Sequence, residues 1–166
     1  GDAALERLAA HSFDITEYVV AIARDDGLAD GLSPLDGGVT LHMACHARAQ
    51  NIGNKAAQML QFVPDTEVKV IERCSGHGGS IGITGDFHEI ALKVGKPVAR
   101  RALEAGSKFV ASECPLAASH IVVGMEQLAM TKNKDGSANN LGKNLPEAGR
   151  AYHPIELFAM AYGLAG

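Results

Sequence analysis

A short apolar run that ends at a cysteine and is followed by a helical pattern occurs three times in this chain. The runs cover residues 39–44, 68–73 and 108–113, and the cysteines that end them are Cys45, Cys74 and Cys114. Strands that alternate with helices form a mainly parallel sheet, and the carboxyl ends of its strands meet at one edge. The pattern therefore predicts an α/β, Rossmann-like fold, a mainly parallel sheet flanked by helices, with a metal site at the carboxyl ends of the strands.

The remaining segments predict helices around this unit within one domain of residues 1–166. Apolar spacing favours one or two N-terminal helices over residues 3–24, the second capped by Ser12 or Asp14. Further helices are expected at 48–62, 86–105, 115–130 and 155–162, the last with Pro154 near its start. The polar stretch 131–152 predicts a flexible loop.

Composition and charge limit the functional classes. The chain has 166 residues, of which 46% are hydrophobic and 20% charged, so it can bury an apolar core. A formal net charge of -4 offers no broad basic surface, so no nucleic-acid partner is expected. No apolar run approaches the roughly 20 residues that span a bilayer. We expect a cytoplasmic domain that could attach peripherally to a membrane through a partner, and its abrupt helical start suggests a cut from a longer polypeptide.

Three cysteines are an odd number in a chain too large to depend on disulfides, so reduced, metal-bound or catalytic thiols are expected. Three thiolates with one more donor would complete a tetrahedral zinc site, or could hold a four-iron cluster with one non-cysteine position. The nearest further donors are His77, His46 and the hydroxyl of Ser75. We favour His77, because flanking glycines would let its loop carry the imidazole toward the cysteines.

The other histidines have simpler interpretations. His42 lies inside a predicted strand and is expected to be a hydrogen-bonded core residue, while His46 could equally cap the helix that follows it. His153, directly before Pro154, is expected to be a structural residue at a helix entry. Three histidines have no chemical cluster around them in the sequence and are assigned to solvent: His11, His88 and His120.

Three motifs resemble a known family. Ala44-Cys45-His46, Glu72-Arg73-Cys74-Ser75-Gly76-His77-Gly78-Gly79 and Ser112-Glu113-Cys114-Pro115 are similar to the cysteine-rich (CCG) domain family of heterodisulfide reductase. Within that family, the resemblance is closer to the group formed by the iron–sulfur subunits of anaerobic glycerol-3-phosphate dehydrogenase and of glycolate oxidase. It covers nearly the whole chain, from residue 13 to residue 157.

The family pattern is a cysteine, then Cys-Cys-Gly, then Cys-x-x-Cys, and these cysteines hold an iron–sulfur cluster or, in some members, zinc. This chain departs from it twice, because Ser75 replaces the second cysteine of Cys-Cys-Gly and Ala117 replaces the last cysteine of Cys-x-x-Cys. Three of the five positions remain cysteine. A double-cubane-like cluster that requires five thiolates is therefore not expected.

The resemblance implies an iron–sulfur electron-transfer domain of an anaerobic-type oxidoreductase complex, similar to the iron–sulfur subunit of glycerol-3-phosphate dehydrogenase. By the same resemblance the chain would be the C-terminal fragment of a larger iron–sulfur protein. Such a domain works with other subunits or domains rather than as a catalyst alone. A [4Fe–4S] cluster would be held by Cys45, Cys74 and Cys114, with His77 or His46 as a further ligand. Amides of the Gly-rich loop would donate hydrogen bonds to sulfur and form the cofactor-binding surface: Gly76, Gly78, Gly79 and Ser80.

Two other functions stay open. The first is a structural or docking module in which zinc is bound by three cysteines and one histidine and no electron moves. The second is a metal-free domain in which a pair of thiols undergoes redox exchange. A cysteine phosphatase is excluded, because residues 75–81 contain no arginine to bind the phosphate dianion.

Overall fold

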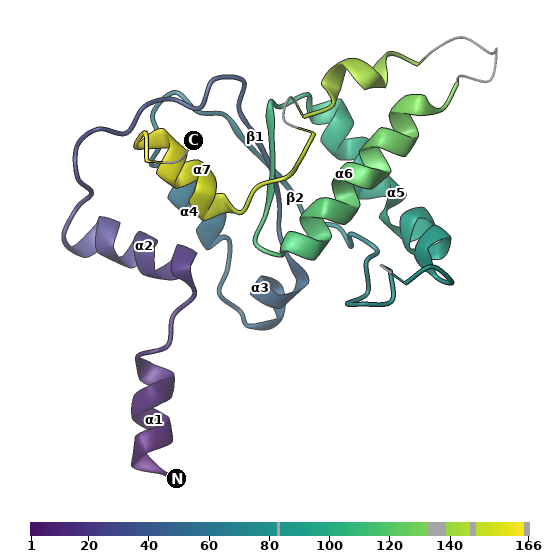
Figure 1. The fold of residues 1–166 in the computed structure, drawn as a ribbon. Coiled ribbons are helices and arrows are strands. Elements are labelled where there is room, and N and C mark those ends of the chain that lie inside the picture. Colours follow the sequence, from purple (N-terminus) through teal and green to yellow (C-terminus); the bar gives the residue numbers. More distant parts are fainter. Residues whose placement is uncertain (83, 133–138, 147–148, 165–166) are drawn as a thin grey trace.

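The computed structural model describes residues 1–82, 84–132, 139–146 and 149–164. At its centre lies a three-stranded parallel sheet between two groups of helices (Figure 1). The strands are β1 (Val39–His42), β2 (Val68–Ile71) and β3 (Phe109–Ser112), in the order β2-β1-β3. The predicted α/β class and the parallel sheet are confirmed, whereas a Rossmann-like topology and a metal site at the strand ends stay predictions.

The register of the sheet aligns the carboxyl ends of its strands. His42, at the end of β1, lies opposite Ile71 of β2 and Ser112 of β3. The outer edge of β3 is covered by Tyr152, whose N–H donates to the carbonyl of Val110 at 2.8 Å. Backbone groups at this edge are thus paired. The turns that follow the three strands lie at the same end of the sheet.

One face of the sheet is covered by α2 (Ile15–Asp25), α4 (Lys55–Leu60) and α7 (Pro154–Ala161). Leu41, Met59 and Leu157 lie in the core between these helices and the sheet, each at most 1% exposed. Burying an apolar side chain of this size stabilises the fold by about 1.5–3 kcal/mol. These long-range contacts hold a sheet whose strands are only four residues long.

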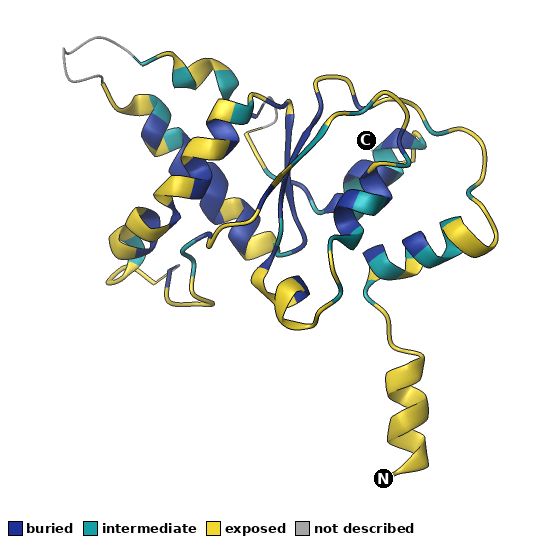
Figure 2. Ribbon diagram, turned by 180° about the vertical axis from the view of Figure 1, so that it is seen from behind, coloured by how far each residue is buried: buried dark blue, intermediate teal, exposed yellow. Residues whose placement is uncertain are grey.

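The other face is covered by α5 (His88–Ala105), α6 (Pro115–Met130) and the short 3-10 helix η1 (Asn140–Asn144). Its core includes Ile71, Leu103 and Met125. The helix α1 (Ala3–Ala10) projects away from this body and has no buried residue (Figures 1 and 2).

Most predicted elements are confirmed, with one clear exception. The single helix expected over 48–62 is wrong, because the chain forms α3 (Cys45–Ala49) and α4 with a break between them. Asn51 and Gly53 in that break adopt φ angles of 55° and 78°, and left-handed residues cannot continue a right-handed helix. The N-terminal segment forms both α1 and α2, and the carboxylate of Asp14 caps α2 by accepting the N–H of Thr16 at 2.8 Å.

The loop predicted over 131–152 falls partly outside the described residues. Within the described part it contains η1, and its last residue, Tyr152, is joined to the sheet. In the part of the chain that the structure describes, no helix has both the length and the apolar character needed to cross a bilayer.

Candidate functional site

A cavity of about 300 Å³ lies beyond the carboxyl ends of the strands, and all three cysteines line it. Cys45 is the first residue of α3, Cys74 follows β2, and Cys114 is the N-cap residue of α6. Residues 29 and 40 positions apart in the chain are therefore brought to one cavity by the parallel sheet. This juxtaposition is what a shared metal site requires, while the ligand role of the cysteines stays a prediction.

The three thiols are free and differ in exposure, with Cys45 and Cys74 exposed and Cys114 half-buried. The N–H of Gly76 donates to the sulfur of Cys74 at 3.4 Å, a contact of the kind expected from the Gly-rich loop. Gly78 and Gly79 also line the cavity. Ser80 is not among the lining residues, and its carbonyl accepts the N–H of Thr84 at 3.3 Å in a turn.

His77 lies between two partners inside this cavity. Its Nε2 is 3.9 Å from the sulfur of Cys114, and its Nδ1 is 2.7 Å from the hydroxyl oxygen of Ser75. Ser75 is only 1% exposed, so its hydroxyl forms a hydrogen bond with the imidazole and is shielded from solvent. Burial, aided by His120 nearby, lowers the pKa of His77, which favours the neutral imidazole that binds metals.

The loop that carries His77 is held closely against α5. A side chain at Gly76, whose φ is 85°, would place its Cβ 2.2 Å from the carbonyl oxygen of Ala91. A Cβ at Gly95 would lie 2.3 Å from the carbonyl oxygen of Ser75. Glycine at both positions therefore permits a backbone approach that any other residue would block. On the far side of the loop, the N–H of Gly82 donates to the carbonyl of His77 at 2.7 Å.

His46 also lines the cavity, from an exposed position in α3. The N-cap position of that helix is Ala44, so His46 is not its N-cap residue. The structure gives no direct contact between His46 and the cysteines, and its role as a ligand stays a prediction.

His42 is confirmed as a hydrogen-bonded core residue. It is 2% exposed, and its two ring nitrogens lie 2.9 Å from the hydroxyl of Ser112 and 2.8 Å from the carbonyl of Arg73. Burial lowers its pKa. The side chain also lines the cavity, so it joins the ends of the three strands beneath the thiols.

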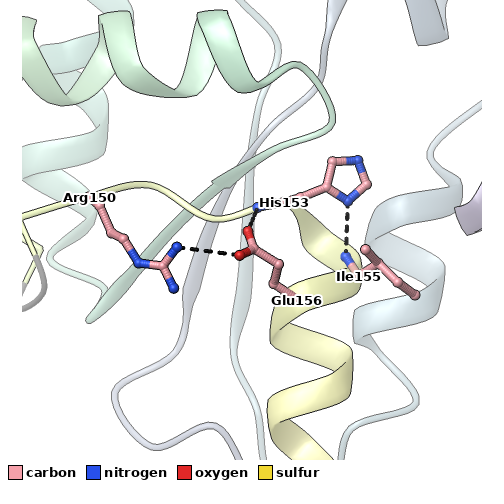
Figure 3. Close-up of polar contacts among 4 residues, drawn as sticks. All are labelled: Arg150, His153, Ile155 and Glu156. Atoms are coloured by element: carbon pink, nitrogen blue, oxygen red, sulfur yellow. Dashed lines mark hydrogen bonds and ion pairs between the residues drawn. The ribbon is translucent and has the colours of Figure 1, made fainter. Parts of the chain in front are cut away.

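His153 is confirmed as a structural histidine at a helix entry. It is the N-cap residue of α7, and its Nδ1 accepts the N–H of Ile155 at 3.3 Å (Figure 3). The carboxylate of Glu156 accepts the N–H of His153 at 2.6 Å and pairs with Arg150 at 3.3 Å. These reciprocal bonds form a capping box.

His120 was expected in solvent, and this expectation is wrong. It is 7% exposed, and in the described part of the chain its Nε2 has no hydrogen-bond partner. Its ring stands edge-on to that of His88 at 5.8 Å, and His88 is half-buried, with Nδ1 2.8 Å from the carbonyl of Gly82. The reason is that α6 packs along α5, which covers the face that carries His120. His11 is exposed, as expected.

An electrostatic interaction between two carboxylates, those of Glu113 and Asp14, was not predicted from the sequence. Glu113, directly before Cys114, is 8% exposed, and burial together with the charge of Asp14 raises its pKa. Burial alone would raise the pKa of Asp14, but hydrogen bonds from Thr16 hold it below the ordinary value. The available signal was an acidic residue at the end of an apolar run, where a polar side chain is expected to be paired.

The donor set can be tested against the two kinds of metal centre. Among the described residues, no group of three or more His, Cys, Asp or Glu side chains is spaced to hold a single metal ion. A cluster distributes its protein ligands over several metal atoms and does not require them to converge on one point. The chemistry of this donor set, three thiols and an imidazole around one cavity, fits an iron–sulfur cluster. Zinc binding stays an alternative prediction.

Comparisons with known proteins point the same way. "Uncharacterized iron-sulfur protein" from Methanocaldococcus jannaschii is 34% identical over 110 residues, which are 65% of this chain and 21% of that protein. One subunit of the dihydromethanophenazine:CoB–CoM heterodisulfide reductase from Methanosarcina acetivorans is 27% identical over 121 residues, which are 69% of this chain and 29% of that subunit. The matching part thus spans less than a third of either relative.

No family model matches the chain, and no solved structure matches it. The expected closer likeness to the iron–sulfur subunit of glycerol-3-phosphate dehydrogenase is not shown by these relatives. The chain is thus similar, at low identity, to one iron–sulfur protein and to one heterodisulfide reductase subunit.

Proposed function

We propose that this chain is an iron–sulfur electron-transfer domain of an oxidoreductase complex related to heterodisulfide reductase. The observation that carries the proposal is that Cys45, Cys74, Cys114 and His77 line one and the same cavity. The names of the two relatives, an iron–sulfur protein and a heterodisulfide reductase subunit, support it. A cytoplasmic location, and attachment to a membrane only through a partner, belong to the same proposal.

The residues that line the cavity would have different roles. Cys45, Cys74 and Cys114 would bind the cluster as thiolates, and His77 would supply the further donor. The amide of Gly76, which already donates to the sulfur of Cys74, would stabilise negative charge on that ligand and adjust the reduction potential. When bound, the cluster supplies one-electron transfer.

Exposure of Cys45 and Cys74 places one side of the site at the surface, where other subunits could exchange electrons with it. The finer proposal, that the parent complex resembles anaerobic glycerol-3-phosphate dehydrogenase and uses a [4Fe–4S] cluster, rests on motif resemblance alone.

Anaerobic reconstitution tests the proposal. The purified chain is incubated with ferrous iron, sulfide and a thiol reductant, desalted, and assayed for iron, sulfide and its visible spectrum before and after dithionite. We expect bound iron and sulfide and a colour that bleaches on reduction. The Cys74→Ser variant should lose this capacity, whereas Ser119→Ala, at an exposed serine of α6, should keep it. A colourless, iron-free protein would overturn the proposal, and stoichiometric zinc would support the structural module instead.

One observation favours thiol chemistry as a second candidate. Cys114 lies at the N-terminus of the 16-residue helix α6, and its sulfur is 3.9 Å from Nε2 of His77, within reach of an imidazole that could take the thiol proton. In such a domain the thiolate would displace one thiol from a small disulfide and form a mixed disulfide, while His77 takes the thiol proton. Preferential labelling of Cys114 over the more exposed cysteines in metal-free protein, with no iron bound after reconstitution, would support this candidate.

A further inference from the structure

One buried histidine connects the turns that carry the cysteines. His42 is the last residue of β1 and is 2% exposed. Its Nε2 lies 2.8 Å from the carbonyl oxygen of Arg73, which directly precedes Cys74. Its Nδ1 lies 2.9 Å from the hydroxyl oxygen of Ser112, two residues before Cys114. A single side chain is thus bonded to residues that lie 31 and 70 positions further along the chain.

The chemistry of these groups determines where each proton lies. A carbonyl oxygen can only accept, so Nε2 of His42 carries the ring proton and donates it to Arg73. Burial lowers the pKa of His42 and keeps the ring neutral, which leaves Nδ1 as an acceptor. The hydroxyl of Ser112 therefore donates to Nδ1, and its oxygen accepts the N–H of Cys114 at 3.3 Å. The three hydrogen bonds all run in one direction, from the amide of Cys114 to the carbonyl of Arg73.

Each end of this series of hydrogen bonds reaches the backbone of a cysteine. The carbonyl of Arg73 belongs to the peptide unit that also contains the nitrogen of Cys74, and a peptide unit is planar. At the other end, the bond is made by the amide nitrogen of Cys114 itself. His42 lies three residues before Cys45 on the strand that leads into the third turn. Because the backbone determines where a side chain begins, these bonds restrict the positions from which the sulfur atoms can reach the cavity.

His42 is suited to hold ligands rather than to be one. Its side chain lines the cavity, but both of its ring nitrogens are already hydrogen-bonded to the protein. A residue that only filled the core would be apolar at less cost, because a buried polar group must find partners. The partners of His42 adjoin two of the three cysteines. Residues that orient ligands in this way contribute strongly to the affinity of a site for its metal.

Resting on the proposed function, we propose that His42 is a positioning residue of the cysteine site, and that together with Ser112 it holds the backbones of Cys74 and Cys114 in the arrangement that the cofactor requires. Ser112 is 0% exposed, so its hydroxyl acts only through His42 and the amide of Cys114. The inference concerns protein groups alone and applies to any cluster or metal that these cysteines bind.

Two buried serines provide the first test. Ser112→Ala removes the hydroxyl between His42 and Cys114, whereas Ser107→Ala removes a hydroxyl that accepts from Thr40 at 2.9 Å, before β3 and away from the cavity. Each variant loses buried hydrogen bonding, so both should lower the midpoint of urea unfolding of the metal-free protein. After anaerobic reconstitution, Ser112→Ala should release iron to a chelator about 10–100-fold faster than the parent protein, and Ser107→Ala at the parent rate. Equally fast release from both variants would reduce the effect to stability and overturn the inference.

Two substitutions at His42 separate the ends of the series. In His42→Asn the amide oxygen can replace Nδ1 as the acceptor for Ser112, but the donor to Arg73 is lost. In His42→Gln the amide nitrogen can replace Nε2 as the donor, but the acceptor for Ser112 is lost. In the metal-free protein, we expect iodoacetamide to alkylate Cys74 severalfold faster in His42→Asn and Cys114 severalfold faster in His42→Gln, as resolved by peptide mass spectrometry. Equal changes at both cysteines, or none, would contradict the assigned directions of the hydrogen bonds.

The two measurements separate this inference from the proposed function. Absence of iron and sulfide from the reconstituted parent protein would overturn the proposed function, and the alkylation rates, which need no metal, would still decide whether His42 acts on the two turns. If iron and sulfide are bound, but Ser112→Ala and the His42 variants retain them as well as the parent protein does, the inference is overturned and the proposed function stands. Ser112→Ala, the milder change, decides the matter if a His42 variant does not fold.

Discussion

His77 and His153 are alike by local measures and differ in what surrounds them. Each is half-buried, each has its pKa lowered by burial, and each uses Nδ1 in a hydrogen bond with a residue two positions away. All partners of the His153 capping box lie within three residues, and its ring also bonds the backbone of Glu113. Nε2 of His77 instead faces Cys114, 37 positions away, in a cavity.

The difference shows how a structural histidine can be told from a candidate ligand. The capping-box bonds of His153 serve the helix that follows it (Figure 3), and the further bond of its ring is to the backbone of Glu113 rather than to a thiol. His77 has one nitrogen held locally and the other directed at a thiol. A half-satisfied ring that lines a cavity with cysteines is available to bind a metal. Four predictions test this contrast.

The largest effect is expected for Cys114→Ser. We expect nearly complete loss of bound iron, because a serine hydroxyl is a poor iron ligand. The fold should be unharmed, since Cys114 makes no side-chain cap of α6 and serine is a favoured N-cap residue that could add up to ~1 kcal/mol. Iron analysis and denaturant unfolding of the metal-free protein measure the two parts. Full iron content in this variant would remove Cys114 from the site.

Gly95→Ala should disturb the His77 region through α5. Alanine would stabilise a free helix by about 1 kcal/mol relative to glycine, yet its Cβ would meet the carbonyl of Ser75 at 2.3 Å. We expect a net loss of about 1–3 kcal/mol in the free energy of unfolding and reduced iron retention. Gly85→Ala is the control, since nothing lies within 4 Å of its Cβ. If Gly95→Ala stabilises the protein, the loop is not held as described.

His153→Ala should affect stability alone. Loss of an N-cap side chain typically costs about 0.5–2 kcal/mol, and we expect a value near 1 kcal/mol in thermal or urea unfolding. Iron content after reconstitution should equal that of the parent protein. Substantial loss of iron would break the contrast with His77, because it would show that the helix entry also supports the cluster.

The smallest effect is the pH dependence of the metal-free protein. Because burial lowers the pKa of both His77 and His153, the unfolded chain binds more protons than the folded chain just below the ordinary value of about 6.5. The free energy of unfolding should therefore fall as the pH drops below about 6.5 and should level off above it. His153→Gln and His77→Gln should each reduce this slope. If the free energy of unfolding of either variant depended more steeply on pH, the lowered pKa assigned to that histidine would be wrong.

Glu113 contributes to the pH dependence of the free energy of unfolding with the opposite sign. Because its pKa is raised, the folded chain keeps the proton of Glu113 up to a higher pH than the unfolded chain does. The stabilisation that Glu113 contributes is therefore lost as the pH rises through the folded-state pKa. The difference between the parent protein and each histidine variant isolates the histidine from this carboxyl.

Much of the fold could be predicted, because the hydrophobic period of a helix or strand and the residues that mark its ends lie close together in the sequence. The three strands, α6 opened by Pro115, and the cap at His153 followed by Pro154 and Glu156 are all readable from adjacent residues. The break between α3 and α4 was missed, because an isolated Asn51 and Gly53 inside an otherwise helical apolar pattern are weak signals of a helix end, although both adopt left-handed φ angles. Burial of His120 was missed because it depends on how α6 packs against α5.

By itself, the sequence determined that strands alternate with helices and that each strand is followed by a cysteine, because hydrophobic period and turn chemistry act within a few residues. Only the tertiary structure decided which donors form a close pair. The contact of Cys114 with His77 depends on a sheet that aligns strand ends and on a glycine in α5 that admits the loop. Distances between segments tens of residues apart follow from packing of the whole chain, and no local pattern encodes them.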